Sequence, residues 1–123
     1  MKTYLLALMV CFSAYLPGFS AELIMVEQPG CPWCTRFNAE IAPAYANAEE
    51  GAYAPLRRVD ISKGWPKDLA HVAPERMTPS FILIESGLEV ARMRGYPGDE
   101  FFWFLLDDML DKTGDWRSIS TSN

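Results

Sequence analysis

Apolar residues are concentrated in four short runs whose spacing predicts strands. Residues 21–28 (AELIMVEQ) and 79–87 (PSFILIESG) are nearly continuous apolar runs, which is typical of buried strands. Residues 54–61 (APLRRVDI) form a shorter candidate, and residues 88–96 (LEVARMRGY) alternate apolar with polar positions. That alternation predicts a half-exposed strand, with Arg92 and Arg94 at solvated positions. Because Ser86-Gly87 separates the last two runs, we expect a β-hairpin there.

Helical spacing follows the first run. Phe37, Ile41 and Tyr45 recur every four residues within 32–47, which predicts a helix with one buried face. Pro43 interrupts this segment, so we expect a kink or two helical pieces. The sequence Glu49-Glu50-Gly51 is expected to end the helical segment.

Two more helices are predicted further along the chain. The first is short, from Pro66 to about Val72, and the second covers residues 99–112 (DEFFWFLLDDMLDK). In the second, we expect the core face to consist of Phe101, Phe104, Leu105 and Met109, with Phe102 and Trp103 partly exposed. Residues 113–123 (TGDWRSISTSN) have little to bury and are expected to form a flexible tail.

The order of these elements predicts one α/β domain over residues 21–112. A parallel strand-helix-strand unit is followed by a short helix, an antiparallel hairpin and a closing helix, giving a four-stranded mixed sheet with flanking helices. The chain of 123 residues has room for one small domain.

Residues 1–20 are predicted to be a cleavable signal peptide rather than part of the fold. Lys2 precedes an apolar stretch, Pro17 breaks it, and the small residues Gly18 and Ser20 come just before Ala21. The alternative is a retained anchor helix, for which the apolar run is short. Export of the chain would place the mature protein in the periplasm.

Charge narrows the possible partners. No acidic residue precedes position 21 and Lys2 is the one basic residue there, so the formal net charge of −5 becomes −6 in the mature chain. An acidic surface without a basic run argues against nucleic acid or anionic lipid as the partner.

The cysteines are the main candidates for chemistry. Cys11 lies in the predicted signal segment, which leaves Cys31 and Cys34 as a single C-x-x-C pair. A disulfide that spans four residues removes little chain entropy, so it stabilises a fold poorly. A lone tight pair in an oxidising compartment therefore indicates redox chemistry.

The position of the pair suits thiol–disulfide exchange. Cys31 lies where the first strand gives way to the first helix, so unpaired N–H groups and the helix dipole stabilise its thiolate. Cys34 lies one turn further on, within disulfide reach. Cys31 can then attack a partner disulfide and Cys34 can release the mixed disulfide. Pro32 fits the first helical turn, and Trp33 places an apolar plate where a histidine would add positive charge, which favours a reductase over a strong oxidant.

Other functions use the same cysteines. A cuprous-ion chaperone could bind its ion with the two thiolates and Met77. A structural zinc site needs four ligands, and beyond the two thiolates the sequence offers only His71 as an obvious donor. A non-catalytic binding module would keep the disulfide as a staple, and a glutaredoxin-like activity would use glutathione.

Several motifs resemble the thioredoxin superfamily. "PGCPWC" follows the first predicted strand and "MTPSFILI" begins the third, while "LRRVDI" and "RGYPGDEFFWFLL" resemble small periplasmic thioredoxin-like proteins, including members from sulfur-oxidation gene clusters. The resemblance implies a minimal thioredoxin-like fold and a monomeric thiol–disulfide oxidoreductase that needs no metal or other cofactor beyond its redox-active disulfide. It also implies protein thiol or disulfide substrates, possible sulfur-oxidation partners and a membrane thiol-reducing electron donor.

The same resemblance assigns roles to individual residues. Cys31 would be the exposed nucleophile, Cys34 the resolving thiol, and Thr78-Pro79 a cis peptide that faces the disulfide and, with Pro32 and Trp33, contacts the substrate. The chain departs from cytosolic thioredoxins at Met25, where those proteins carry a buried carboxylate. By period-two counting Glu27 lies on the same face of the strand. The early strand and helix of full-length thioredoxins are also missing.

Overall fold

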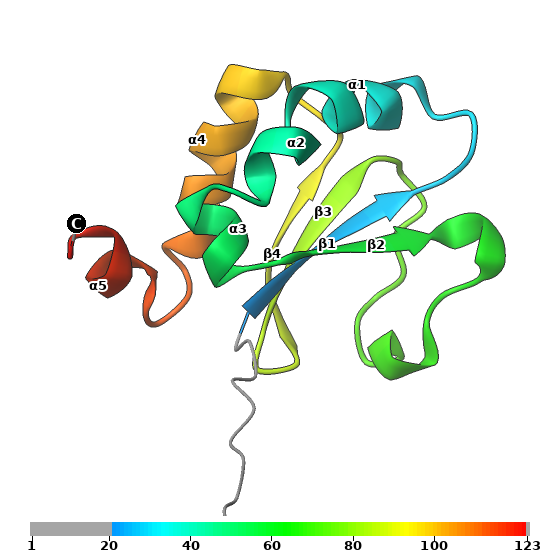
Figure 1. Cartoon of the computed structure of the whole chain (residues 1–123). Coiled ribbons are helices and arrows are strands. Elements are labelled where there is room, and N and C mark those ends of the chain that lie inside the picture. The colour runs from blue at the N-terminus through cyan, green and yellow to red at the C-terminus, as the bar shows by residue number, and fades with distance from the viewer. Residues whose placement is uncertain (1–20, 123) are drawn as a thin grey trace, which may run out of the picture.

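The computed structural model describes residues 21–122 and has a sheet of four strands with helices packed against it (Figure 1). Its elements in chain order are β1 (Ala21–Glu27), α1 (Pro32–Glu40), α2 (Ala42–Tyr45), α3 (Glu49–Tyr53), β2 (Leu56–Asp60), the 3₁₀ turns η1 (Ile61–Lys63) and η2 (Lys67–Leu69), β3 (Ser80–Glu85), β4 (Leu88–Arg94), α4 (Asp99–Leu110) and α5 (Trp116–Ser120). The predicted signal segment, residues 1–20, lies outside the described residues. Among the helices of residues 21–122, none has both the length and the apolar character that crossing a membrane requires.

The sheet has the predicted mixed topology. Its strand order is β2-β1-β3-β4; β1 pairs with β2 in parallel, whereas β1–β3 and β3–β4 are antiparallel. The hairpin turn is at Ser86 and Gly87, whose φ angles of 50° and 82° are both positive, as a two-residue type I′ turn requires. The predicted α/β class and the four-stranded mixed sheet are therefore confirmed.

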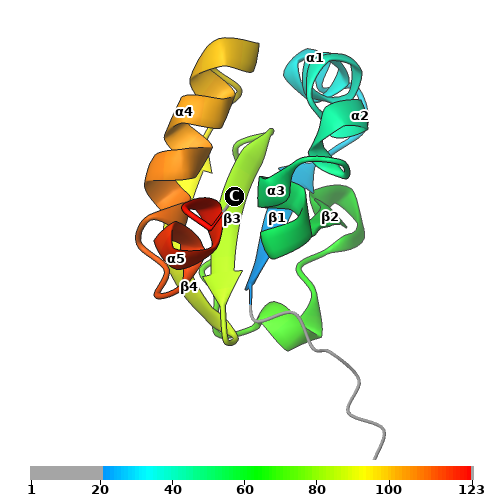
Figure 2. The same ribbon diagram turned by 60° about the vertical axis from the view of Figure 1, so that its left-hand side comes forward.

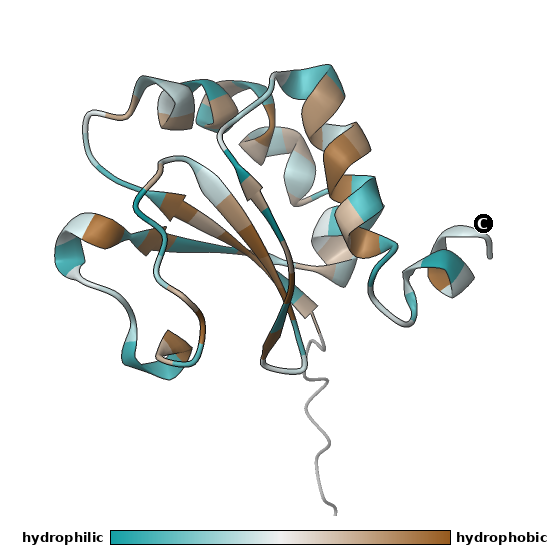
Figure 3. Ribbon diagram, turned by 180° about the vertical axis from the view of Figure 1, so that it is seen from behind, coloured by the Kyte–Doolittle hydropathy of each residue, from teal (hydrophilic) through white to brown (hydrophobic). Residues whose placement is uncertain are grey.

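Both faces of the sheet are buried, by different means. On one face Leu23, Met25 and Phe81 pack under the helices, and Figure 2 shows α4 on one side of this face and α1 to α3 on the other. On the opposite face Ile24 and Ile82 pack against the long segment between β2 and β3, which contributes Leu69 and Val72. Figure 3, in which the molecule is seen from behind, shows apolar residues along the strands. Period-two alternation along β1 and β3 divides the core in this way.

Pro43 has the predicted effect on the first helical segment. α1 ends at Glu40, and Ala42 and Pro43 begin the separate short helix α2. Phe37, Ile41 and Tyr45 are all buried, as predicted. Two neighbouring predictions are wrong: Glu49 to Tyr53 form a further helix instead of ending one, and the helix predicted from Pro66 is a 3₁₀ turn of three residues.

The predicted buried face of the last helix is wrong by one position. Phe102, Leu106, Met109 and Leu110 are buried, whereas Phe101 and Phe104 are 63% and 71% exposed. The run FFWFLL is apolar on every side, so it does not define the phase of the helix. Only Met109 belongs to both the predicted and the observed face.

The chain after residue 112 buries more than the sequence predicts. Trp116, at the start of α5, is 3% exposed and belongs to the core cluster under the helices. Its ring packs on Tyr53 with centroids 5.3 Å apart, and its indole N–H donates to the Asp107 carboxylate at 2.8 Å. A single large aromatic residue among polar neighbours has no periodicity, which explains why the pattern missed it.

Candidate active site

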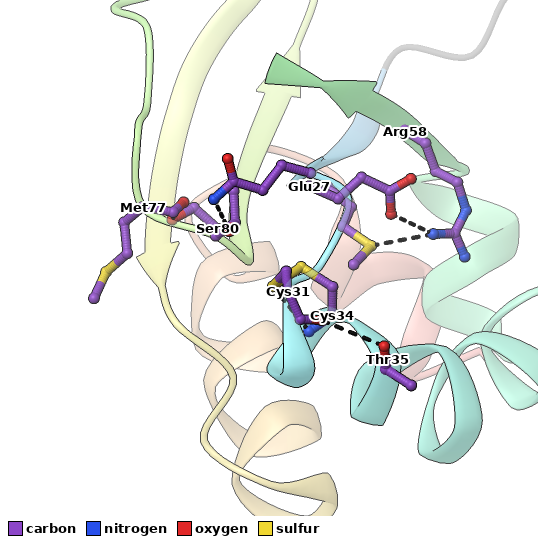
Figure 4. The surroundings of a disulfide bond; sticks show 10 residues. Glu27, Cys31, Cys34, Thr35, Arg58, Met77 and Ser80 are labelled. Carbon is purple, nitrogen blue, oxygen red and sulfur yellow. Dashed lines mark hydrogen bonds and ion pairs between the residues drawn. A yellow bond between two sulfur atoms is a disulfide. The ribbon is translucent and has the colours of Figure 1, made fainter. Parts of the chain in front are cut away.

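The two cysteines form a disulfide where β1 passes into α1 (Figure 4). Their Cα atoms are 5.2 Å apart, within the range that a disulfide spans. The turn before them contains Gly30 with φ of +76°, a conformation that glycine adopts without steric cost. This turn brings Cys31 to the N-terminus of the helix.

Cys31 is the N-cap residue of α1, as its position in the sequence predicts. Its Sγ accepts a hydrogen bond from the Cys34 backbone N–H at 3.2 Å, and Pro32 occupies the first turn. The same N–H and the positive end of the helix dipole would stabilise negative charge on Cys31 after the disulfide is reduced.

Both sulfur-bearing residues are largely covered in the disulfide form. Cys31 is 8% exposed and Cys34 5%, so the prediction of an exposed Cys31 is not met in this state. The bond to Cys34 and the hydrogen bond from its N–H hold the Cys31 sulfur against the helix. Both cysteines border a surface pocket of about 290 Å³, which gives the pair contact with solvent.

Trp33 forms an exposed plate next to the disulfide. It is 52% exposed, and the guanidinium of Arg36 lies over its ring, 5.3 Å from the centroid. Arg36 also lies 5.8 Å from the Tyr96 ring and pairs with Glu40 at 2.9 Å. The Tyr96 hydroxyl donates to Glu40, and this hydrogen bond together with Arg36 lowers the pKa of that carboxyl. The Arg36 guanidinium, which pairs with the Glu40 carboxylate, therefore packs over the Trp33 ring.

The Thr78-Pro79 peptide bond is cis, as the resemblance implies. Its loop is tied to the turn before Cys31, because the Gln28 side-chain amide donates to the Thr78 hydroxyl at 3.0 Å. The Pro79 carbonyl accepts from the Gly95 N–H at 2.8 Å. The structure thus links this loop both to the disulfide turn and to the connection between β4 and α4.

Met25 and Glu27 have different surroundings although both belong to β1. Met25 is fully buried, and its sulfur lies 3.5 Å from a terminal nitrogen of Arg58. Glu27 pairs with Arg58 at 2.6 Å and borders the pocket beside the disulfide (Figure 4). Asp60, the β2 partner of Glu27 in the strand register, borders the same pocket. Two carboxylates therefore line the pocket that borders both cysteines.

Sequence reasoning missed Glu75, which lies three residues before Thr78. Its side chain is 9% exposed and pairs with Arg92 at 3.2 Å and Arg94 at 2.6 Å. Arg92 is itself 10% exposed, so its predicted solvated position is wrong. One feature of the sequence could have predicted this ion pair: Arg92 and Arg94 lie two residues apart and so on one face of a strand, where a nearby carboxylate would pair with them.

Residues 21–122 contain no group of three or more histidine, cysteine or acidic side chains arranged to hold a metal ion. The His71 ring nitrogen contacts the Gly87 carbonyl in the β3–β4 turn. That turn is at the opposite end of β3 from Pro79. His71 is therefore separated from the cysteines by the length of a strand.

Comparison with solved structures shows the family. No family model and no curated protein matches the chain. The periplasmic thioredoxin SoxS from Paracoccus pantotrophus, in its reduced form, is 40% identical over 75% of this chain and 97% of its own, with a TM-score of 0.69. Thioredoxins from Malassezia sympodialis (15% identity, TM-score 0.57, covering 75% of this chain and 76% of theirs) and Fasciola hepatica (18%, 0.57, 74% and 82%) share the fold.

The chain belongs to the thioredoxin superfamily. It is a thiol–disulfide oxidoreductase whose Cys31 and Cys34 form the C-x-x-C disulfide of that class.

Proposed function

We propose that the protein is exported to the periplasm and reduces disulfides of partner proteins by dithiol exchange through Cys31 and Cys34. The observation that carries this proposal is the hydrogen bond from the Cys34 N–H to the Cys31 sulfur at the start of α1. This arrangement favours the thiolate at Cys31 and leaves Cys34 one turn further into the helix.

The exchange has two balanced steps. In the dithiol form, the Cys31 thiolate attacks one sulfur of the partner disulfide, the partner S–S bond breaks, and the released partner thiolate takes up a proton. Cys34 then loses its proton and attacks the Cys31 sulfur of the mixed disulfide, which releases the second partner thiol. The partner gains two electrons and two protons, and the Cys31–Cys34 bond reforms, as in the structure.

The partner chain docks between Trp33 and the loop that carries Thr78 and Pro79. Trp33 offers an exposed apolar surface beside the disulfide, and Pro32 lies between it and Cys31. The link from Gln28 to Thr78 keeps the two sides of this site together. Backbone groups at Thr78-Pro79 would orient an extended partner segment, as strand-like peptides are oriented by main-chain hydrogen bonds.

Net reduction is the proposed direction. No histidine between the cysteines adds positive charge to stabilise the thiolate, and a less stabilised thiolate means a more reducing pair. A membrane thiol-reducing protein would return electrons to Cys31–Cys34. The description of SoxS as a periplasmic thioredoxin and the signal-like residues 1–20 support export. The resemblance of "LRRVDI" and "RGYPGDEFFWFLL" to small proteins of sulfur-oxidation gene clusters supports sulfur-oxidation proteins as candidate partners.

A trapping experiment tests the proposal. Cys34→Ser should accumulate mixed disulfides with its natural partner, because the first step proceeds and the second cannot. Cys31→Ser is the matched control and should trap nothing. Mass spectrometry of the captured proteins identifies the partner. If neither variant traps a protein and the wild type keeps its disulfide under thioredoxin-level reduction, the chain is a binding module instead.

A further inference from the structure

The loop before Thr78-Pro79 contains a nearly buried carboxylate, Glu75, that binds four donors. One oxygen accepts the backbone N–H groups of Arg76 at 3.0 Å and Met77 at 3.2 Å. The other accepts from Arg92 at 3.2 Å and Arg94 at 2.6 Å, both on β4. We call Glu75, Arg92 and Arg94 the loop clamp.

The loop clamp joins the loop to the edge of the sheet. Arg92 also donates to the Ala73 carbonyl at 2.8 Å, so it binds the loop backbone directly as well as through Glu75. Arg94 is the β4 partner of Ser80, the first residue of β3. Both ends of the segment from Ala73 to Ser80 are therefore fixed to the same strand.

Met77 is held from both sides next to the docking residues. Its N–H donates to Glu75, and its carbonyl accepts from the Ser80 hydroxyl at 2.8 Å. Its side chain is 54% exposed. The backbone N–H and carbonyl of Met77 are therefore both hydrogen-bonded, whereas its side chain is largely exposed. We infer that the loop clamp preserves the backbone conformation of the loop and not the packing of the Met77 side chain.

We propose that Glu75 is a positioning residue for partner docking: it fixes the backbone from Arg76 to Thr78 so that the Thr78-Pro79 segment presents its main-chain groups to the partner. This role rests on the proposed reductase function. Glu75 touches neither sulfur, so it affects how the partner binds and leaves the chemistry of Cys31 unchanged.

Glu75→Gln tests the role because glutamine offers one acceptor oxygen where glutamate offers two. Its NH₂ group cannot accept from the pair of donors that it faces, whether these are the two arginines or the two backbone N–H groups. The assay uses insulin as the disulfide substrate and dithiothreitol as the electron source. The KM of Glu75→Gln for insulin should be about tenfold higher than that of the wild type, because the loop loses hydrogen bonds to a charged group. Its kcat should stay within about twofold of the wild-type value. Alkylation of reduced Cys31 by iodoacetamide should keep its wild-type rate. Amide exchange at Met77 should become faster.

Glu89→Gln is the matched control. Glu89 also pairs with Arg92, at 2.5 Å, and its side-chain hydrogen bonds run to Arg92 and not to the loop. Its KM and its Met77 exchange should stay within about twofold of wild type. Equal KM values in the Glu75 and Glu89 variants would overturn the docking role.

Arg94→Gln covers the case in which Glu75→Gln does not fold. The Arg94 side chain is 63% exposed, so its replacement should be tolerated, and it removes one of the two β4 donors. We expect KM to rise about threefold, and an unchanged KM would contradict the proposal. A wild-type protein that leaves insulin intact would overturn the proposed function itself, whereas an active wild type with unaffected variants would overturn only the role of Glu75.

Discussion

At the scale of single residues, the sequence predicts some of the residues that form the site and does not predict others. Cys31 was recognisable as a helix N-cap because a glycine turn and a proline surround it. Thr78 and Pro79 were found through their resemblance to a known motif. Glu75 was missed because its partners Arg92 and Arg94 are 17 and 19 residues away, and no periodicity relates a loop residue to a strand.

The ionic state of Glu75 predicts a pH-dependent stability. Burial would raise the pKa of this carboxyl, but hydrogen bonds from Arg94, the Met77 N–H, Arg92 and the Arg76 N–H outweigh burial and lower the pKa from 4.5 to about 2. Because the folded pKa lies below the unfolded one, the stabilisation is fully present above about pH 4.5 and is lost as the pH falls towards 2.

Glu75→Gln should therefore lower the free energy of unfolding at pH 7 by about 3 kcal/mol. The difference from wild type should shrink between pH 4.5 and pH 2. Urea denaturation at a series of pH values measures this difference in unfolding free energy. Glu89→Gln is the control: it removes a more exposed ion pair and should lower the unfolding free energy by less than about 1 kcal/mol. A difference that stays constant down to pH 2 would contradict the assigned charge.

At the scale of elements, hydrophobic period identified the strands better than the helices. Alternation and apolar runs located β1, β3 and β4, and Pro43 explained the break between α1 and α2. In α4 the apolar run covers a full turn, so nothing in it distinguishes the buried side. The phase is set by tertiary packing: Phe102 meets Phe37 and Phe81, with ring centroids 5.3 and 5.1 Å apart.

Two substitutions in α4 test the observed phase. Phe102→Ala removes a fully buried ring and should cost about 3–5 kcal/mol of unfolding free energy. Phe104→Ala removes a largely exposed ring and should change it by about 0.5 kcal/mol or less. Chemical denaturation of both variants gives the comparison, and equal losses would show that the helix is rotated.

At the scale of the whole molecule, one sheet carries two unequal layers. Within residues 21–122, the α-helices pack on one face, and the long segment between β2 and β3, with the 3₁₀ turn that contributes Leu69, covers the other. The sequence predicts the order of the elements and the mixed sheet. It does not predict that the chain beyond residue 112 completes the helical layer, since Trp116 is one aromatic residue in a polar stretch.

Trp116→Ala should therefore destabilise the entire domain. The substitution removes the contact with Tyr53 and the hydrogen bond to Asp107, and we expect a loss of about 3–5 kcal/mol. Ile119→Ala is the control on the same short helix, because Ile119 is 47% exposed and should change stability little. Thermal unfolding of both variants, followed by circular dichroism, measures the difference. Equal stabilities of Trp116→Ala and the wild type would show that the C-terminal segment is dispensable for the fold.

The disulfide closes a ring inside the first turn of one helix, with only two residues between its cysteines. Opening that ring frees no long segment, so the entropy that reduction restores to the chain is small. The same scaffold can then hold the oxidised and the reduced pair in alternation. Each cycle breaks and reforms one bond without releasing a long stretch of chain, which suits a carrier that must turn over many times without unfolding.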